Sequence, residues 1–133
     1  VTGGTRALVQ KALVVAAPSL APRLLHEALD LGGEPGDLAL ELALEVAAQG
    51  IRANVVAPGA INTDMLQTAY AAIAEAEGIS VAEAAAKENA SIPLGRPAEP
   101  DEIAAAIAFL AGPDASYITG IVLPVAGGMA PGI

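Results

Sequence analysis

The sequence of 133 residues has no cysteine and no tryptophan, and it contains one histidine, one phenylalanine and two tyrosines. The absence of cysteine excludes disulfide bridges, thiolate catalysis and metal sites with cysteine ligands, and it suits a reducing compartment. A single histidine also excludes a zinc site built from several imidazoles. We therefore expect no bound metal and a cytoplasmic location.

Basic residues are scarce as well: 6 lysines and arginines stand against 15 acidic residues, which gives a formal net charge of −9. Nucleic acids and anionic membrane surfaces are bound through clustered lysine and arginine side chains. No apolar run approaches the roughly 18 residues of a membrane-spanning helix, and the first residues lack the pattern of a secretory signal. The sequence thus predicts a chain that binds neither nucleic acid nor membrane.

Hydrophobic residues make up 54% of the chain, which excludes a disordered tail. Short apolar runs alternate with segments of helical periodicity, and glycine or proline separates them. The expected strands span residues 11–17, 51–57 and 120–126, and the expected helices span residues 20–31, 37–49, 64–77, 80–90 and 100–111. Because helices separate the strands, the pattern predicts an α/β fold with a partial parallel sheet of about three strands, in that order, and helices on both faces. We expect a single domain over residues 1–133.

The helix expected over residues 37–49 is apolar around most of its circumference. Its polar residues, Asp37, Glu41, Glu45 and Gln49, form one narrow stripe, and every other residue is leucine, valine or alanine. Such a helix must be covered on two sides. We expect the sheet on one side and a second copy of the chain on the other, so that the chain forms a homo-oligomer.

Several expected element ends have side chains that suit them. Asn62 or Thr63 can accept a free backbone N–H of the helix that begins at residue 64, and Ser80 has the spacing of a capping box. Arg52 and Asn54, in the second expected strand, are interpreted as structural residues.

Residues 50–65, with the sequence GIRANVVAPGAINTDM, resemble the segment of short-chain dehydrogenases/reductases that lies beside the nicotinamide of the cofactor. Further blocks follow in the order and spacing of that family: IPLGR at 92–96, PDEIA at 100–104, ASYITG at 115–120 and VAGG at 125–128. The similarity covers residues 37–129 and is greatest to the 3-oxoacyl-carrier-protein reductase group. It implies a shortened Rossmann-like domain with three layers, from an oxidoreductase that transfers hydride between NAD(P) and a small carbonyl or alcohol substrate.

The resemblance also implies cofactor contacts after the second strand. A turn that leaves a parallel strand sits at the carboxyl edge of the sheet, where open α/β folds bind ligands. Pro58 and Gly59 form this turn, and in relatives the backbone near Ile61 and the hydroxyl group of Thr63 contact the nicotinamide end of NAD(P). The alternative is that Pro58, Gly59 and Thr63 only form a turn and a helix cap.

The start of the chain resembles the first part of the family's phosphate-binding turn. The matching residues are Gly3, Gly4, Thr5 and Arg6. The next two glycine positions of that turn are Ala7 and Val9, whose side chains narrow the space for the pyrophosphate and hinder close helix–strand packing. The alternative for residues 1–10 is a flexible arm.

The catalytic Tyr-x-x-x-Lys pair of the family is missing. Counted back from Gly50, its two positions are Ala28 and Gly32, and neither Tyr70 nor Tyr117 is followed by lysine four residues later. In the family the lysine lowers the pKa of the tyrosine, and the phenol exchanges a proton with the substrate oxygen. The standard mechanism therefore lacks its proton donor in this chain.

Two polar residues in the first third of the chain are weaker candidates. Ser19 stands where the family has a serine that orients the substrate, although a helix cap before Leu20 is the simpler interpretation. His26 is interpreted most simply as a solvated residue on the polar face of the helix expected over residues 20–31.

Two functions follow from these observations. In the first, the chain descends from an NAD(P)-dependent oxidoreductase of this family. The shortened chain then has weak or absent NAD(P) binding and weak or lost activity. The alternative is a non-catalytic dimerisation or scaffold module, natural or engineered, whose apolar helices associate. A third interpretation is an incomplete sequence, in which an omitted segment holds the tyrosine and the lysine.

Overall fold

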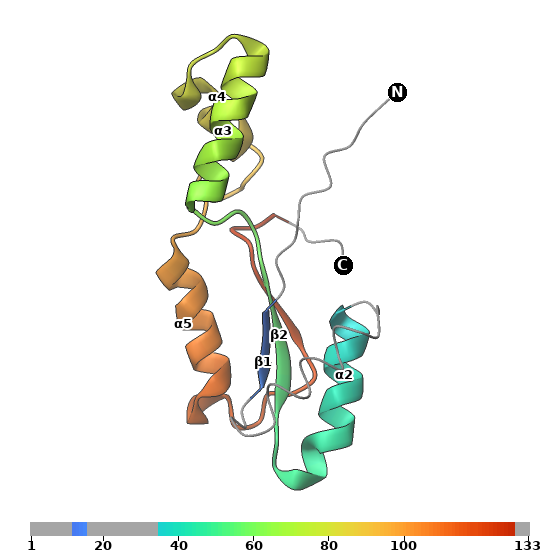
Figure 1. Ribbon diagram of the computed structural model, residues 1–133. Coiled ribbons are helices and arrows are strands. Elements are labelled where there is room, and N and C mark those ends of the chain that lie inside the picture. Colours follow the sequence, from blue (N-terminus) through green and yellow to red (C-terminus); the bar gives the residue numbers. More distant parts are fainter. Residues whose placement is uncertain (1–11, 16–34, 130–133) are drawn as a thin grey trace.

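The computed structural model describes residues 12–15 and 35–129, with the backbone alone for residues 12–15, 35, 36 and 38. Its sheet has three strands, β1 (Ala12–Val15), β2 (Ala53–Pro58) and β3 (Val122–Val125), in the order β1-β2-β3 (Figure 1). All residues of the central strand β2 are buried. The predicted positions and order of the three strands are confirmed.

β2 and β3 are parallel, as the alternation of helices and strands predicts. Their register places Val55 opposite Val122 and Pro58 opposite Val125. Pro124 has no backbone N–H to donate, which suits its place in the strand at the end of the strand order.

The direction of β1 differs from the sequence-based prediction. β1 pairs antiparallel with β2, from Ala12 opposite Val56 to Val15 opposite Ala53, so the prediction of three parallel strands is wrong for this strand. Its four residues are all apolar, and such a run has no pattern that specifies a direction. Antiparallel pairing is slightly more stable per residue, and parallel sheets often have one antiparallel strand at an edge.

Four α-helices and two 3₁₀ turns are found among the described residues: α2 (Pro35–Val46), η1 (Ala47–Gln49), α3 (Asp64–Glu77), α4 (Val81–Asn89), α5 (Pro100–Ala111) and η2 (Pro113–Ala115). They confirm the helices predicted over 37–49, 64–77, 80–90 and 100–111. The helix predicted over 20–31 lies outside the described residues. None of the helices in this part of the chain combines the length and hydropathy needed to cross a membrane.

α2 and α5 cover opposite faces of the sheet (Figure 1). On one face, Val46 of α2 belongs to an apolar cluster with Ala53 of β2. On the other face, Ile103 and Leu110 of α5 pack in a cluster with Val56 of β2. Ala53 and Val56 are three residues apart, so the alternation of side chains along a strand sends them to opposite faces. The predicted three-layer, Rossmann-like arrangement is therefore present in the described part of the chain.

Two polar side chains hold β2 in place at its amino end. The guanidinium group of Arg52 donates to the carbonyl oxygens of Leu110 (2.6 Å) and Gly112 (3.0 Å) at the end of α5. Asn54 is buried, and its amide nitrogen donates to the carbonyl oxygen of Ile118 at 3.0 Å. Both contacts confirm the structural roles predicted for Arg52 and Asn54.

α3 and α4 form a helical hairpin beyond the carboxyl edge of the sheet (Figure 1). The buried Tyr70 of α3 donates its hydroxyl to Asn89 Oδ1 at the end of α4 over 2.7 Å. Lys87 of α4 pairs with Glu77 of α3 at 2.6 Å. Residues 59–63 and 91–99 connect this hairpin to the rest of the fold.

Candidate functional site

Four of the residues predicted to contact a cofactor lie at the carboxyl edge of the sheet: Pro58, Gly59, Ile61 and Thr63. The parallel strands β2 and β3 both end there, with Pro58 opposite Val125. The N–H of Gly59 donates to the carbonyl oxygen of Val125 at 3.1 Å, which holds the first residue after β2 against β3. We call residues 59–63 the site loop; it leads from β2 to the first turn of α3.

Gly59 occupies a position where the chain approaches itself closely. A Cβ atom there would lie 2.9 Å from Ala126 Cα and 3.1 Å from the terminal methyl of Met129. A contact of 2.9 Å with backbone is too short for a side chain, so the packing of the segment after β3 is enough to require glycine. The close approach at Gly59 is thus made by the backbone of the chain itself, at Ala126.

The middle of the site loop pairs with the segment before α5 in one parallel bridge, between Ile61 and Ala98. Ala98 N–H donates to the carbonyl oxygen of Ala60 at 2.9 Å, and Asn62 N–H donates to the carbonyl oxygen of Ala98 at 2.8 Å. In this pattern the N–H and C=O of Ile61 point away from Ala98. Within the described part of the chain, that N–H has no hydrogen-bond partner, and the carbonyl oxygen has only the Thr63 hydroxyl at 3.4 Å.

Thr63 is the N-cap of α3, and it is one of the two residues, with Asn62, that the sequence predicts for this cap. Its Oγ1 accepts from the N–H of Leu66 at 3.5 Å, a long hydrogen bond, and the residue is exposed. Asn62, the other predicted cap, has a different role in the structure. The cap of the simpler interpretation is present, but the turn is not: Pro58 is the last residue of β2, and Gly59 and Ala60 continue from it without a turn. The exposed Thr63 keeps its hydroxyl beside Ile61.

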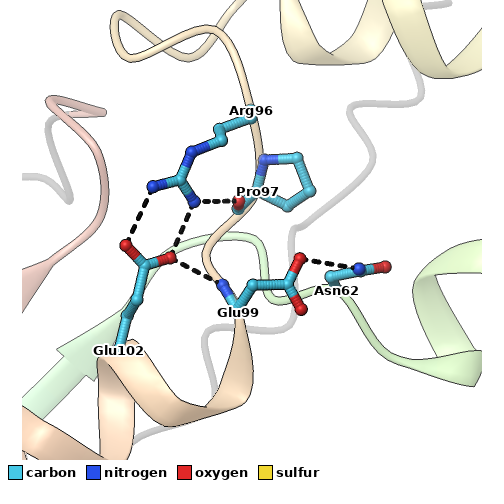
Figure 2. Close-up of polar contacts among 5 residues, drawn as sticks. All are labelled: Asn62, Arg96, Pro97, Glu99 and Glu102. Atoms are coloured by element: carbon cyan, nitrogen blue, oxygen red, sulfur yellow. Dashed lines mark hydrogen bonds and ion pairs between the residues drawn. The ribbon is translucent and has the colours of Figure 1, made fainter.

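A chain of polar contacts supports the site loop from the side of α5 (Figure 2). Arg96 binds Glu102 through two hydrogen bonds of 2.7 and 2.9 Å, and Glu102 Oε2 accepts the backbone N–H of Glu99 at 2.8 Å. Glu99 Oε1 in turn accepts from the side-chain amide of Asn62 at 2.9 Å. The hydrogen bonds from Arg96 lower the pKa of Glu102 to about 2.

Sequence reasoning missed this chain of contacts. Arg96 and Glu102 lie in blocks that resemble the family, yet their spacing of six residues across a loop matches neither helical nor strand periodicity. One available signal is the spacing of Glu99 and Glu102, which is that of a capping box at the start of α5.

The remaining predicted site residues belong to parts of the chain that the structure does not describe. Ser19 and the phosphate-turn residues Gly3, Gly4, Thr5 and Arg6 are outside the described residues, as is His26. Tyr117 is fully exposed and precedes β3, so it lies at the amino end of that strand, opposite to the site loop. No cluster of three or more histidine, aspartate or glutamate side chains suited to a metal ion occurs among residues 12–15 and 35–129.

A hollow of about 650 Å³ lies at the opposite, amino-terminal edge of the sheet. Arg52 is the charged residue that lines it, and four backbone carbonyls already accept hydrogen bonds from this guanidinium group. A cation engaged in this way has little capacity for a ligand, so the carboxyl edge is the better candidate site.

Known proteins similar to this chain include several reductases. The family model described as enoyl-(acyl carrier protein) reductase matches residues 37–130. The 3-oxoacyl-acyl-carrier-protein reductase FabG of Vibrio cholerae is 44% identical over 88 residues, which are 66% of this chain and 32% of that protein. The chain spans about a third of the length of the curated relatives it matches.

Solved structures agree with this similarity. A short chain dehydrogenase family protein from Francisella tularensis matches with a TM-score of 0.67 and 36% identity, over 71% of this chain and 39% of that one. An actinorhodin polyketide ketoreductase crystallised with NADPH matches with a TM-score of 0.64 and 33% identity, over 73% of this chain and 37% of that one. The family model matches more than half of the residues of this chain, and the chain therefore belongs to the short-chain dehydrogenase/reductase family.

Proposed function

We propose that this chain carries the nicotinamide side of an NAD(P) site from an oxidoreductase that acts on small carbonyl or alcohol substrates. The observation that carries the proposal is the peptide of Ile61, whose N–H and C=O point away from Ala98 at the carboxyl edge of the sheet. Open α/β sheets bind ligands at that edge. The relative solved with NADPH supports a nicotinamide cofactor.

The chemistry of the nicotinamide fits this peptide. A carboxamide group offers an NH₂ donor and a carbonyl acceptor, so it can pair with one backbone C=O and one backbone N–H at the same time. Ile61 supplies both groups. The exposed hydroxyl of Thr63 makes only long contacts, with the Ile61 carbonyl oxygen at 3.4 Å and the Leu66 N–H at 3.5 Å, so it can turn to the cofactor instead. Pro58 and Gly59 contribute by fixing where the loop leaves β2.

Turnover is proposed to be weak or lost. Hydride transfer to a carbonyl needs a group that gives a proton to the oxygen, and the family's tyrosine and lysine positions are Ala28 and Gly32. The buried hydroxyl of Tyr70 is engaged with Asn89, and its pKa is raised, chiefly by burial. Neither property suits a proton donor for a substrate at the site loop.

Calorimetric titration of the purified chain with NADPH and NADH tests the cofactor site. We expect saturable binding, weakened about fivefold by Thr63→Val, because one hydrogen bond contributes about 1 kcal/mol. Thr63→Ser retains the hydroxyl and keeps the native affinity. The matched control is Thr68→Val, which removes another exposed threonine hydroxyl of α3, one that donates to the carbonyl oxygen of Asp64 at 2.8 Å. Absence of binding at millimolar cofactor, or equal losses in the two valine variants, would contradict the proposal.

A non-catalytic dimerisation or scaffold module is the second candidate. The observation in its favour is the outer face of α2, where Leu40 is 51% exposed and Leu44 is 72% exposed. Two leucines on one helical face, one turn apart, form a seam on which another helix can pack. The partner proposed for this seam is a second copy of the chain, which the analytical ultracentrifugation described in the Discussion tests.

A further inference from the structure

Asn62 is the residue through which the site loop is joined to its surroundings. Its backbone N–H donates to the carbonyl oxygen of Ala98, and its side-chain amide nitrogen donates to Glu99 Oε1 at 2.9 Å. Its Oδ1 accepts from the side-chain amide of Gln67 at 2.9 Å. Both sides of the Asn62 amide are therefore engaged, one with the start of α5 and one with α3, which fixes its orientation.

The partner of the loop is itself held by the charged residues shown in Figure 2. We call Arg96, Glu99 and Glu102 the loop clamp. Glu102 accepts from the Glu99 backbone and from both ends of the Arg96 guanidinium group, and Arg96 also donates to the carbonyl oxygen of Pro97 at 3.1 Å. The clamp thus fixes both ends of the segment 96–99, which contains the bridge residue Ala98.

The clamp connects the site loop to the core. Glu102 lies in the first turn of α5, and its neighbour Ile103 is buried in the cluster formed with Val56 of β2. The orientation of the Ile61 peptide depends on the two hydrogen bonds around Ala98, and the position of Ala98 depends on the clamp. Loss of these two hydrogen bonds would let the N–H and C=O of Ile61 leave their present direction.

We propose that Asn62, Arg96 and Glu102 are positioning residues of the nicotinamide-side site: they set the direction of the Ile61 peptide without touching the cofactor. The expected effect on cofactor affinity rests on the proposed function. The positioning of the loop rests only on the hydrogen bonds described above. Bidentate pairs between arginine and carboxylate combine charge with fixed geometry, which suits this role better than a single hydrogen bond.

The chain offers a matched control for the clamp. Glu83 at the start of α4 occupies the same capping-box position as Glu102: it accepts the backbone N–H of Ser80 at 2.9 Å, is exposed, and has a pKa that the hydrogen bonds from Ser80 lower. Its hydrogen bonds are with Ser80, and none of them joins it to Asn62, Ala98 or the loop clamp. Glu83→Gln and Glu102→Gln therefore make the same chemical change at two helix starts, of which only one supports the site loop.

Two measurements on the full chain test the inference. The first is amide hydrogen exchange by NMR for the N–H groups of Asn62 and Ala98, which donate across the bridge. We expect Glu102→Gln to speed both exchanges about tenfold, as the loss of a charge-assisted hydrogen bond allows, and Glu83→Gln to leave them unchanged. Arg96→Lys, which keeps the charge, is expected to restore part of the protection that Arg96→Ala loses.

The second measurement is titration with NADPH and NADH. We expect about fivefold weaker binding for Glu102→Gln and for Asn62→Ala, and native affinity for Glu83→Gln. Native exchange rates in Glu102→Gln, or equal effects of the two glutamine variants on affinity, would overturn the inference. A native chain that binds no cofactor overturns the proposed function instead, and the exchange rates still show whether the clamp holds the loop.

Discussion

Gly59 and Thr63 each have a structural role in the site loop, and at Thr63 a cofactor contact is also proposed. The approach of Ala126 alone requires a residue without a side chain at position 59. Thr63 caps α3 through a long hydrogen bond of 3.5 Å, which leaves its hydroxyl accessible for another partner. A structural role and a binding role are therefore compatible at Thr63, and the effect of a variant on stability must be measured beside its effect on affinity.

Gly59→Ala is expected to lower the free energy of unfolding by about 1–3 kcal/mol, because the added methyl group lies 2.9 Å from the backbone of Ala126. Urea denaturation followed by circular dichroism measures the change.

Gly50→Ala is the comparison. A Cβ atom at position 50 meets no atom within 4 Å, but Gly50 has a φ of +73°, so the expected cost of about 1 kcal/mol comes from backbone strain. Asparagine tolerates that φ, so Gly50→Asn should be milder than Gly50→Ala, whereas Gly59→Asn should be worse than Gly59→Ala. A native stability for Gly59→Ala would show that the close approach is not rigid.

Helix starts are the best-specified elements of this chain. Ser80 and Glu83 make both hydrogen bonds of a capping box at α4, as their spacing predicts. α3 begins at the residue expected from the threonine before it, and Pro100 opens α5. These features depend on residues within four positions of one another, so they can be predicted from sequence alone. The ion pair between Arg96 and Glu102 spans a loop and could not be predicted in the same way.

The start of α5 is expected to weaken in acid. The pKa of Glu102 in the folded chain is about 2, below its usual value of 4.5, because it accepts hydrogen bonds from Arg96 and the Glu99 backbone. A lowered pKa in the folded state stabilises the fold above the unfolded value, and this stabilisation is lost as the pH falls from about 4.5 to about 2. Carboxyl NMR should give a titration midpoint near 2 for Glu102, and Arg96→Ala should move it upward. A midpoint near 4.5 in the native chain would mean that the pair does not persist in solution.

The outer face of α2 is a feature of the whole molecule rather than of one element. The sheet buries Leu42, Ala43 and Val46, while Leu40 and Leu44 face outward beside the carboxylates of Glu41 and Glu45. The apolar helix predicted to need two covers thus has one cover among the described residues. A chain with a formal net charge of −9 also repels its own copies, which opposes association at low ionic strength.

We expect the chain to self-associate through this face, more strongly at 0.5 M salt than at 0.05 M, since salt screens the repulsion between carboxylates. Sedimentation equilibrium measures the association constant. Leu44→Glu should reduce it at least tenfold, because a charged group replaces an apolar contact. Leu94→Glu is the matched control, since Leu94 is also 72% exposed but lies between α4 and α5. A chain that stays monomeric in both salts, or equal effects of the two variants, would contradict this interface.

The sequence by itself determined the helices predicted between residues 37 and 111, the positions and order of the strands and the family, because caps, periodicity and contiguous blocks are local properties. The tertiary structure decided the direction of β1, since a four-residue apolar run has no directional pattern. It also decided the arrangement of the candidate site. The direction of the N–H and C=O of Ile61, and their support by Asn62, Arg96 and Glu102, arise where segments more than 30 residues apart in sequence pair. Such contacts form only when the carboxyl ends of β2 and β3 and the start of α5 meet, and no local pattern encodes that meeting.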